Sequence, residues 1–229
     1  MARKITNKRK VKKSVLIAFE DSKSSKYYFN DLLRAKNLKG KIELVNKDKG
    51  QDPNSVLNKI LKYKEKANDS FIRKWIVIDK DHWDTPQQKY NYSKTIEKAR
   101  NLNICVALSN DAYELWIFLH FESLNRDTHR DKLKSMLNTI FLDKFGKKYE
   151  KSSSDIYKLI ETYQNQAIKN AKKLVNQYLS NYGKIDPTKN PITMIYELVE
   201  YLNEIDKFEE NNTQFFPLKT DYEPYKFLK

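Results

Sequence analysis

The sequence predicts an α/β protein: a mainly parallel sheet flanked by helices, followed by a helical extension. Three observations support this class. Short apolar runs alternate with stretches of helical periodicity in the first half of the chain, the pattern of repeated strand–helix units. The run Trp75-Ile76-Val77-Ile78 is unbroken, as in strands buried on both faces. The second half keeps the helical periodicity but lacks comparable apolar runs.

Four apolar runs are the expected strands, at residues 14–19, 42–45, 75–79 and 104–108. Helices are expected between them. The first follows Asp21-Ser22, and the second starts at Asp52-Pro53, with Asp as the cap and Pro in the first turn. The third covers about 87–101. After the last run, Ser109-Asn110-Asp111 is expected to cap a buried helix over 112–121, which is apolar on nearly every side.

The chain divides into three parts on composition. Residues 1–13 are rich in Lys and Arg and are interpreted as a flexible basic arm or a solvated leader. Residues 14–125 carry the α/β pattern and form the expected core. Residues 126–229 form the expected helical extension packed on the core, with helices near 129–144, 153–181 and 191–205.

Composition narrows the class of function. The net charge of +14 favours a polyanionic partner, nucleic acid first, although a general Lys-rich bias would give the same surplus. The four glycines stand too far apart for a phosphate-binding loop, so nucleotide hydrolysis would need a partner.

Cys105 is the only cysteine, which excludes a disulfide framework. With no signal peptide and no membrane-spanning run, we expect a cytoplasmic protein that does not bind membranes.

The Asp-x-Asp after the third apolar run is the first candidate site. In an extended chain Asp79 and Asp81 point the same way, and the carboxyl ends of parallel strands open onto the ligand crevice. Two adjacent carboxylates repel each other unless a cation lies between them, and Mg²⁺ prefers such oxygen ligands. The alternative is a solvated turn in which an Asp caps the next helix.

Two further acids belong with this pair. Glu20 ends the first apolar run, so it is expected at the same edge of the sheet. Glu114 lies inside the buried helix, where a carboxylate is unfavourable unless it is paired or metal-bound. Pairing with a Lys or a loop amide is the alternative for Glu114.

Basic residues flank these acids and are candidates for contacts to substrate phosphates. They are Lys23, Lys26, Lys80 and His82. Each lysine is equally compatible with a solvated surface charge. His82 is also a candidate ligand for a softer metal.

The placement of Glu20 and of Asp79-x-Asp81 resembles the Toprim fold of topoisomerases, primases and several nucleases. The chain more closely resembles the RloB family of bacterial defence proteins, which have a Toprim-like core. The segments that carry this resemblance are Phe19-Glu20-Asp21-Ser22-Lys23-Ser24-Ser25-Lys26-Tyr27-Tyr28-Phe29, Val77-Ile78-Asp79-Lys80-Asp81, Ser109-Asn110 through Glu114-Leu115-Trp116 to Leu119-His120-Phe121-Glu122, and Asn190-Pro191-Ile192-Thr193-Met194-Ile195-Tyr196-Glu197-Leu198. Together they lie within roughly residues 14–205.

The resemblance implies a metal-dependent endonuclease that is the effector of an anti-phage, abortive-infection system. In this role Glu20 is the general acid/base, and Asp79 and Asp81 hold Mg²⁺, with Mn²⁺ as the alternative ion. Asp84 is then a further metal ligand and Glu114 an additional acid behind them. An RloA-type ATPase is the implied partner, and RNA, transfer RNA included, is the favoured substrate.

The chain departs from the family pattern in the first helix. Asp21 stands where Gly is usual, and Ser24-Ser25 stands where Thr-Glu is usual, so one family acid is missing. This departure favours the alternative function, a non-catalytic Toprim-like subunit that binds nucleic acid or its ATPase. Nucleotidyl transfer, as in primases, is a third option.

Overall fold

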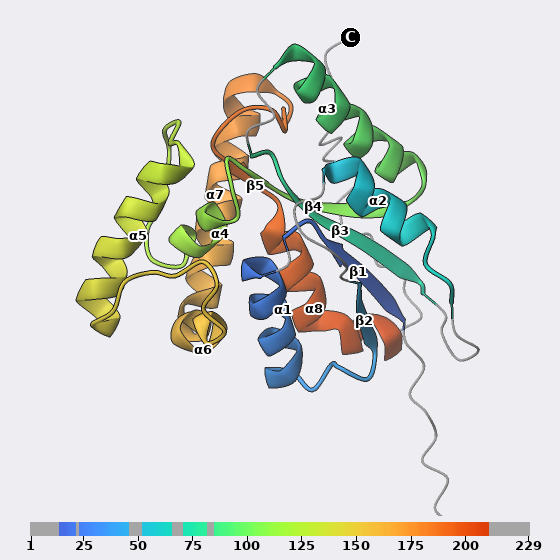
Figure 1. Cartoon of the computed structure of the whole chain (residues 1–229), viewed down its shortest axis with the longest axis horizontal. Helices are drawn as coiled ribbons and strands as arrows, with labels where there is room; N and C mark the ends of the chain where they lie inside the picture. Colours follow the sequence, from blue (N-terminus) through green and yellow to red (C-terminus); the bar gives the residue numbers. More distant parts are fainter. Residues whose placement is uncertain (1–13, 22, 46–51, 66–70, 82–84, 211–229) are drawn as a thin grey trace, which may run out of the picture.

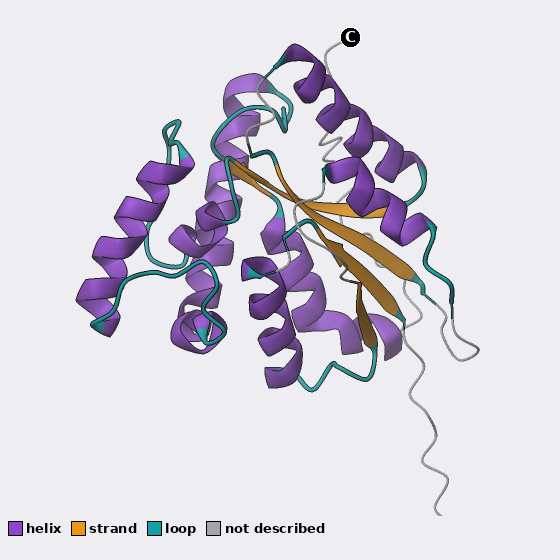
Figure 2. Ribbon diagram, in the orientation of Figure 1, coloured by secondary structure: helices purple, strands orange, loops and turns teal. Residues whose placement is uncertain are grey.

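The computed structural model of the chain describes residues 14–21, 23–45, 52–65, 71–81 and 85–210, with side chains to residue 205. Within these ranges five strands form one sheet, in the order β2-β1-β3-β4-β5 (Figure 2). They are β1 (Val15–Phe19), β2 (Ile42–Val45), β3 (Arg73–Asp79), β4 (Ile104–Asn110) and β5 (Ile192–Thr193). Strands β1 to β4 are parallel, and β5 is antiparallel to β4. The predicted α/β class with a mainly parallel sheet is confirmed.

Helices cover both faces of the sheet (Figure 1). On one face lie α2 (Pro53–Leu61) and α3 (Pro86–Asn101), and on the other lie α1 (Ser24–Ala35) and α8 (Ile195–Glu210). Every residue of β1 is buried as a result. This explains why the strand reads as an unbroken apolar run rather than an alternating one.

The remaining helices stand beside the sheet (Figure 1). They are α4 (Glu114–Leu119), α5 (Arg130–Phe145), α6 (Ile156–Ile160), the 3₁₀ turn η1 (Glu161–Tyr163) and α7 (Gln164–Tyr182). The expected helix over 153–181 is therefore three consecutive elements rather than one. Both α5 and α7 end at a glycine with a left-handed backbone, Gly146 and Gly183, where residues with a Cβ are disfavoured.

The last part of the chain returns to the sheet. In β5, Ile192 and Thr193 pair with Asn110 and Ser109 of β4, and the Ser109 and Thr193 hydroxyl oxygens lie 2.7 Å apart. The Asn110 amide donates to the Pro187 carbonyl (3.0 Å). The prediction that Ser109 and Asn110 cap a helix was therefore wrong, because both residues extend β4 to meet β5. The expected helix from residue 191 begins at 195 for the same reason.

The expected boundary at residue 125 remains a prediction. The part beyond it is not only helical, since β5 completes one edge of the sheet. It also supplies core residues: the ring centroids of Trp75 in β3 and Tyr201 in α8 are 5.9 Å apart.

A chain of buried hydrogen bonds connects α8, α7, α1 and α4. The Asn203 amide donates to Gln164 (3.0 Å), and the Gln164 amide donates to the Tyr28 hydroxyl (3.2 Å). Tyr28 lies 3.4 Å from Nε2 of His120, whose Nδ1 lies 2.9 Å from the Trp116 carbonyl. A carbonyl accepts only, so Nδ1 carries the proton and Nε2 accepts from Tyr28. Burial lowers the pKa of His120 to about 4, which keeps the ring neutral.

The structure also bears on the expectations for membrane-spanning segments and for Cys105. No described helix is long and apolar enough to cross a membrane. Burial raises the pKa of the Cys105 thiol to about 12, so the thiol is protonated and unreactive at neutral pH. The predicted basic arm at 1–13 lies outside the described residues.

Candidate active site

Two of the expected acids meet where the sheet changes its winding direction. The chain passes from β1 to β2 on one side and then returns across β1 to β3, so the switch point lies between β1 and β3. Ligand crevices of open α/β sheets form at the carboxyl ends of the strands at this point. Glu20 follows β1, and Asp79 is the last residue of β3. The Asp79 backbone N–H donates to Oε2 of Glu20 at 2.9 Å, so the predicted pair is brought together.

Burial and mutual repulsion determine the protonation of this pair. Burial, and next the charge of Asp79, raise the pKa of Glu20 from 4.5 to about 9. Burial also raises the pKa of Asp79 to about 7; the Lys151 ammonium opposes this increase and Glu114 adds to it. Without a bound cation, Glu20 is therefore protonated at neutral pH, and Asp79 is poised between its two forms.

Glu114 joins the pair from α4. It is the first residue of that helix and only 6% exposed. Its Oε1 lies 3.7 Å from the Lys151 ammonium. Its Oε2 is buried and has no hydrogen-bond partner among the described residues. A buried carboxylate oxygen without a partner is unfavourable, so this atom is suited to a ligand that brings positive charge or a proton.

Lys151 is a member of the site that the sequence did not predict. It lies in the turn between α5 and α6, and its Nζ is 3.8 Å from Asp21 as well as 3.7 Å from Glu114. Burial lowers the pKa of Lys151, but the carboxylates of Glu114, Asp79 and Asp21 raise it above its ordinary value overall. The ammonium therefore stays charged and is the cation of the acid cluster, by which we mean Glu20, Asp21, Asp79 and Glu114. No local pattern distinguishes Lys151 among the chain's many basic residues.

Asp21 is held by the first turn of α1. Its carboxylate accepts from the backbone N–H groups of Lys23 (2.7 Å) and Ser24 (3.1 Å). An acidic residue just before a helix usually accepts hydrogen bonds from the first N–H groups in this way. Asp21, which stands where the family usually has Gly, thus accepts hydrogen bonds at the start of α1, and its carboxylate also lies near the Lys151 ammonium.

Asp81 does not join the acid cluster. Strand β3 ends at Asp79, and Asp81 has a left-handed backbone (φ 50°), so the period-two alternation stops before it. Its N–H donates to the Asp111 carbonyl (3.0 Å), and its carboxylate forms an ion pair with Arg130. The backbone N–H of Arg130 donates to the Asp111 carboxylate (3.0 Å). Asp81, Asp111 and Arg130 thus form a second charged group, and the last two were not predicted.

The candidate phosphate contacts differ in accessibility. Lys23 is exposed at the start of α1, and Lys26 is partly exposed one turn later. Lys80 is buried, with its N–H bonded to the Ser109 carbonyl (2.9 Å), so it belongs to the interior. Asp84 and His82 lie outside the described residues.

The carboxylates of the acid cluster are the right type of ligand for a hard divalent cation, but they do not stand at the spacing of a metal site. Carboxylate oxygens are the ligands that Mg²⁺ and Mn²⁺ prefer. The buried Oε2 of Glu114, which has no hydrogen-bond partner among the described residues, is an atom that a cation could contact. Across the described ranges, however, no three His, Cys, Asp or Glu side chains already stand at metal-binding spacing. A cation would therefore require these side chains to rearrange.

Comparison with known proteins identifies the family. A sequence model described as RloB-like protein matches residues 15–202, which span all five strands and most of α8. No match to the chain was found among the curated proteins or among the solved structures. The match contains every segment on which the resemblance was based, and in the structure two of these segments, at Ser109-Asn110 and Ile192-Thr193, pair with each other. The chain belongs to the RloB-like protein family.

Proposed function

We propose that this protein is a metal-dependent nuclease that hydrolyses phosphodiester bonds in nucleic acid, with RNA as the favoured substrate. The acid cluster at the β1–β3 switch point is the main support, and the unpartnered, buried Oε2 of Glu114 is the observation that carries it. Acids at the ends of two adjacent parallel strands are also what a Toprim-like core requires. The family's link to anti-phage defence extends the proposal to an abortive-infection effector that works with an RloA-type ATPase.

In this proposal Asp79 and Glu114 are the ligands that would hold Mg²⁺ or Mn²⁺. The cation would polarise the phosphate and neutralise its charge. Asp81 would be a further ligand only if its carboxylate left Arg130 and bound the cation instead. Asp84 is the remaining candidate ligand from the sequence. Glu20 is placed beside Asp79, whose backbone N–H donates to its Oε2, so it is suited to act as the general acid that gives a proton to a leaving oxygen.

The positive groups near the cluster have separate roles. Lys151 holds Glu114 and Asp21 in place and balances part of their charge. Arg130 is fixed by Asp111, and its planar guanidinium is suited to bidentate recognition of a phosphate once Asp81 releases it. Lys23 and Lys26 are the exposed candidates for contacts to the following phosphates.

Cleavage of labelled RNA by purified protein with Mg²⁺ or Mn²⁺ tests the proposal. Transfer RNA, single-stranded RNA and single-stranded DNA are compared, with Asp79→Asn and Glu20→Gln as variants. Loss of a metal ligand or of the general acid should lower the cleavage rate by about 100-fold or more. Asp143→Asn, at an exposed acid of α5, is the matched control and should cleave at the wild-type rate. Equal cleavage by wild type and Asp79→Asn would contradict the proposal.

A non-catalytic subunit is the second candidate function. The pairing of Asp81 with Arg130 favours it, because this ion pair separates the Asp-x-Asp motif that a metal site would use. The buried Ser25, where the family usually has Glu, favours it as well. This candidate predicts tight, salt-sensitive binding of nucleic acid and no product in the cleavage assay, with or without divalent cations.

A further inference from the structure

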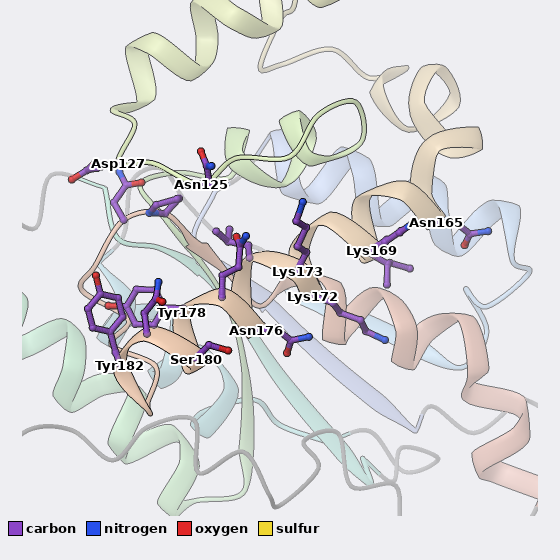
Figure 3. Close-up of a pocket in the computed structure, with 16 residues that line it drawn as sticks. Asn125, Asp127, Asn165, Lys169, Lys172, Lys173, Asn176, Tyr178, Ser180 and Tyr182 are labelled. Atoms are coloured by element: carbon purple, nitrogen blue, oxygen red, sulfur yellow. The ribbon is translucent and has the colours of Figure 1, made fainter.

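A polar groove runs along the exposed side of α7. It has a volume of about 1210 Å³, and its second wall is formed by the loop before α5 and the segment before β5. Figure 3 shows the side chains of α7 spaced along the groove, with Tyr178 and Tyr182 together at one end and Asn125 and Asp127 on the loop. The groove is separate from the acid cluster. Of the four segments that carry the family resemblance, only the last contributes to its lining, through Asn190 and Pro191.

The lining is rich in positive charge. It includes three lysines, Lys169, Lys172 and Lys173, and one acid, Asp127. Lys172 donates to Glu200 of α8 at 2.5 Å, so its charge is already balanced. Lys169 and Lys173 are exposed, lie one helical turn apart, and form no ion pair with any described residue. Two unbalanced cations on one side of a helix favour an anionic occupant.

Aromatic and amide groups accompany the lysines. The ring centroids of Tyr178 and Tyr182 lie 4.8 Å apart, and Tyr182 is 64% exposed, which is unusual for so large a ring. Asn176 and Ser180 add an amide and a hydroxyl group to the lining. Cations that follow a phosphate backbone, combined with rings on which bases stack, are the features of sites for single-stranded nucleic acid.

One short segment links the groove to the second charged group, Asp81, Asp111 and Arg130, which lies beside the end of β3. Asn125 and Asp127 line the groove, and Arg130, three residues later, pairs with Asp81. Asn190, which also lines the groove, donates to the Thr128 carbonyl at 3.0 Å and fixes this segment.

We propose that the α7 groove binds the backbone and bases of single-stranded nucleic acid. The lysines contact phosphates, and Tyr182 stacks on a base. Binding itself stands independently of catalysis. Only the further step, that the groove delivers the strand past Arg130 to the acid cluster, rests on the proposed nuclease function.

The test measures binding of a fluorescent 20-nucleotide single-stranded RNA to the full chain in EDTA, at several salt concentrations. Lys169→Ala/Lys173→Ala should weaken binding by roughly 10- to 25-fold near 0.1 M salt, and should reduce the slope of log K against log salt by about 1.4, since each phosphate contact contributes about 0.7. Tyr182→Ala should weaken binding by roughly fivefold or more, and Tyr182→Phe, which keeps the ring, should bind like wild type. Lys36→Ala/Lys39→Ala removes the same charge at exposed positions near the end of α1, at the opposite edge of the sheet, and is the matched control.

The outcomes separate the two proposals. Weaker binding by the groove variants with unchanged binding by the control supports the groove, whether or not any RNA is cleaved. Equal binding by the groove variants and the control overturns it, and would assign the groove to another occupant such as an acidic protein surface. If RNA is cleaved at the wild-type rate by the groove variants at limiting substrate, the nuclease stands and the delivery step fails.

Discussion

At the scale of single residues, the sequence predicted the position of an acid only while the local backbone stayed regular. Glu20 and Asp79 were predictable because each ends a buried strand, and parallel strands share their carboxyl edge. Asp81 was not, since the strand stops two residues earlier and the Asp111 carbonyl holds its N–H. Lys151 and Arg130 come from segments far along the chain, and nothing in their own neighbourhoods marks them.

The raised pKa of Glu20 makes stability depend on pH. Between its ordinary value of 4.5 and about 9, the folded protein holds a proton that the unfolded chain releases. The free energy of unfolding should therefore fall as pH rises through this window. Glu20→Gln removes this contribution. The Tm of the variant should therefore decrease less between pH 5 and pH 9 than the Tm of wild type does. Each kcal/mol of free energy of unfolding corresponds to a difference in Tm of roughly 2–4 °C. Calorimetry in EDTA measures this difference.

Glu122→Gln, at an exposed acid, is the control and should keep the wild-type pH dependence. If Glu20→Gln keeps it as well, Glu20 is already ionised in the folded protein. Burial and the charge of Asp79 would then not determine the protonation of this carboxyl group.

At the scale of elements, the types of strands β1 to β4 and of the helices followed from periodicity, but strand β5 and the contacts between elements did not. The Asp52-Pro53 start of α2 was predicted correctly, because a cap depends on neighbouring residues only: the Asp52 side chain accepts from the N–H groups of Asn54 and Ser55. The end of β4 was predicted wrongly because its partner, β5, lies more than 80 residues away. The hydrogen-bond chain through Tyr28 and His120 joins four helices and likewise has no local signature.

Tyr28→Phe tests whether that chain of hydrogen bonds contributes to stability. The substitution leaves the Gln164 amide and Nε2 of His120 without their buried partner. The free energy of unfolding should fall by about 1–3 kcal/mol, as for other buried polar groups that lose a partner. Denaturation by urea measures it. Tyr90→Phe, at a ring that is 57% exposed on α3, should change stability by less than about 0.5 kcal/mol, and an equal effect of the two substitutions would show that the buried chain contributes nothing particular.

At the scale of the whole molecule, the α/β part and the helical part share one core. Trp75 of β3 packs against Tyr201 of α8, and the Asn170 amide of α7 donates to the Leu119 carbonyl of α4 (2.8 Å). Composition changes near residue 125 and thus suggested a boundary, but composition carries no information about which surfaces are buried against each other. The surplus of positive charge, in contrast, was visible in the sequence, and the α7 groove is one place where it gathers.

A fragment of residues 1–125 should therefore not fold by itself. It would expose Trp75, Leu119 and the β4 edge to water, and burial of large apolar side chains contributes about 1.5–3 kcal/mol for each one. Amide NMR spectra should be poorly dispersed for the fragment and well dispersed for the full chain. Co-expression with residues 126–229 should restore dispersion, and a well-dispersed spectrum of the isolated fragment would establish an independent domain.

The pairing of β5 with β4 also sets the order of events during synthesis. The loop that holds Asp111 beside Asp81 is fixed by Pro187 and Thr193, and the ribosome makes these residues last among those that form the site. A nascent chain still attached to the ribosome therefore lacks a finished site until Thr193 has emerged. In the nuclease proposed above, this order would protect the translation machinery that produces it.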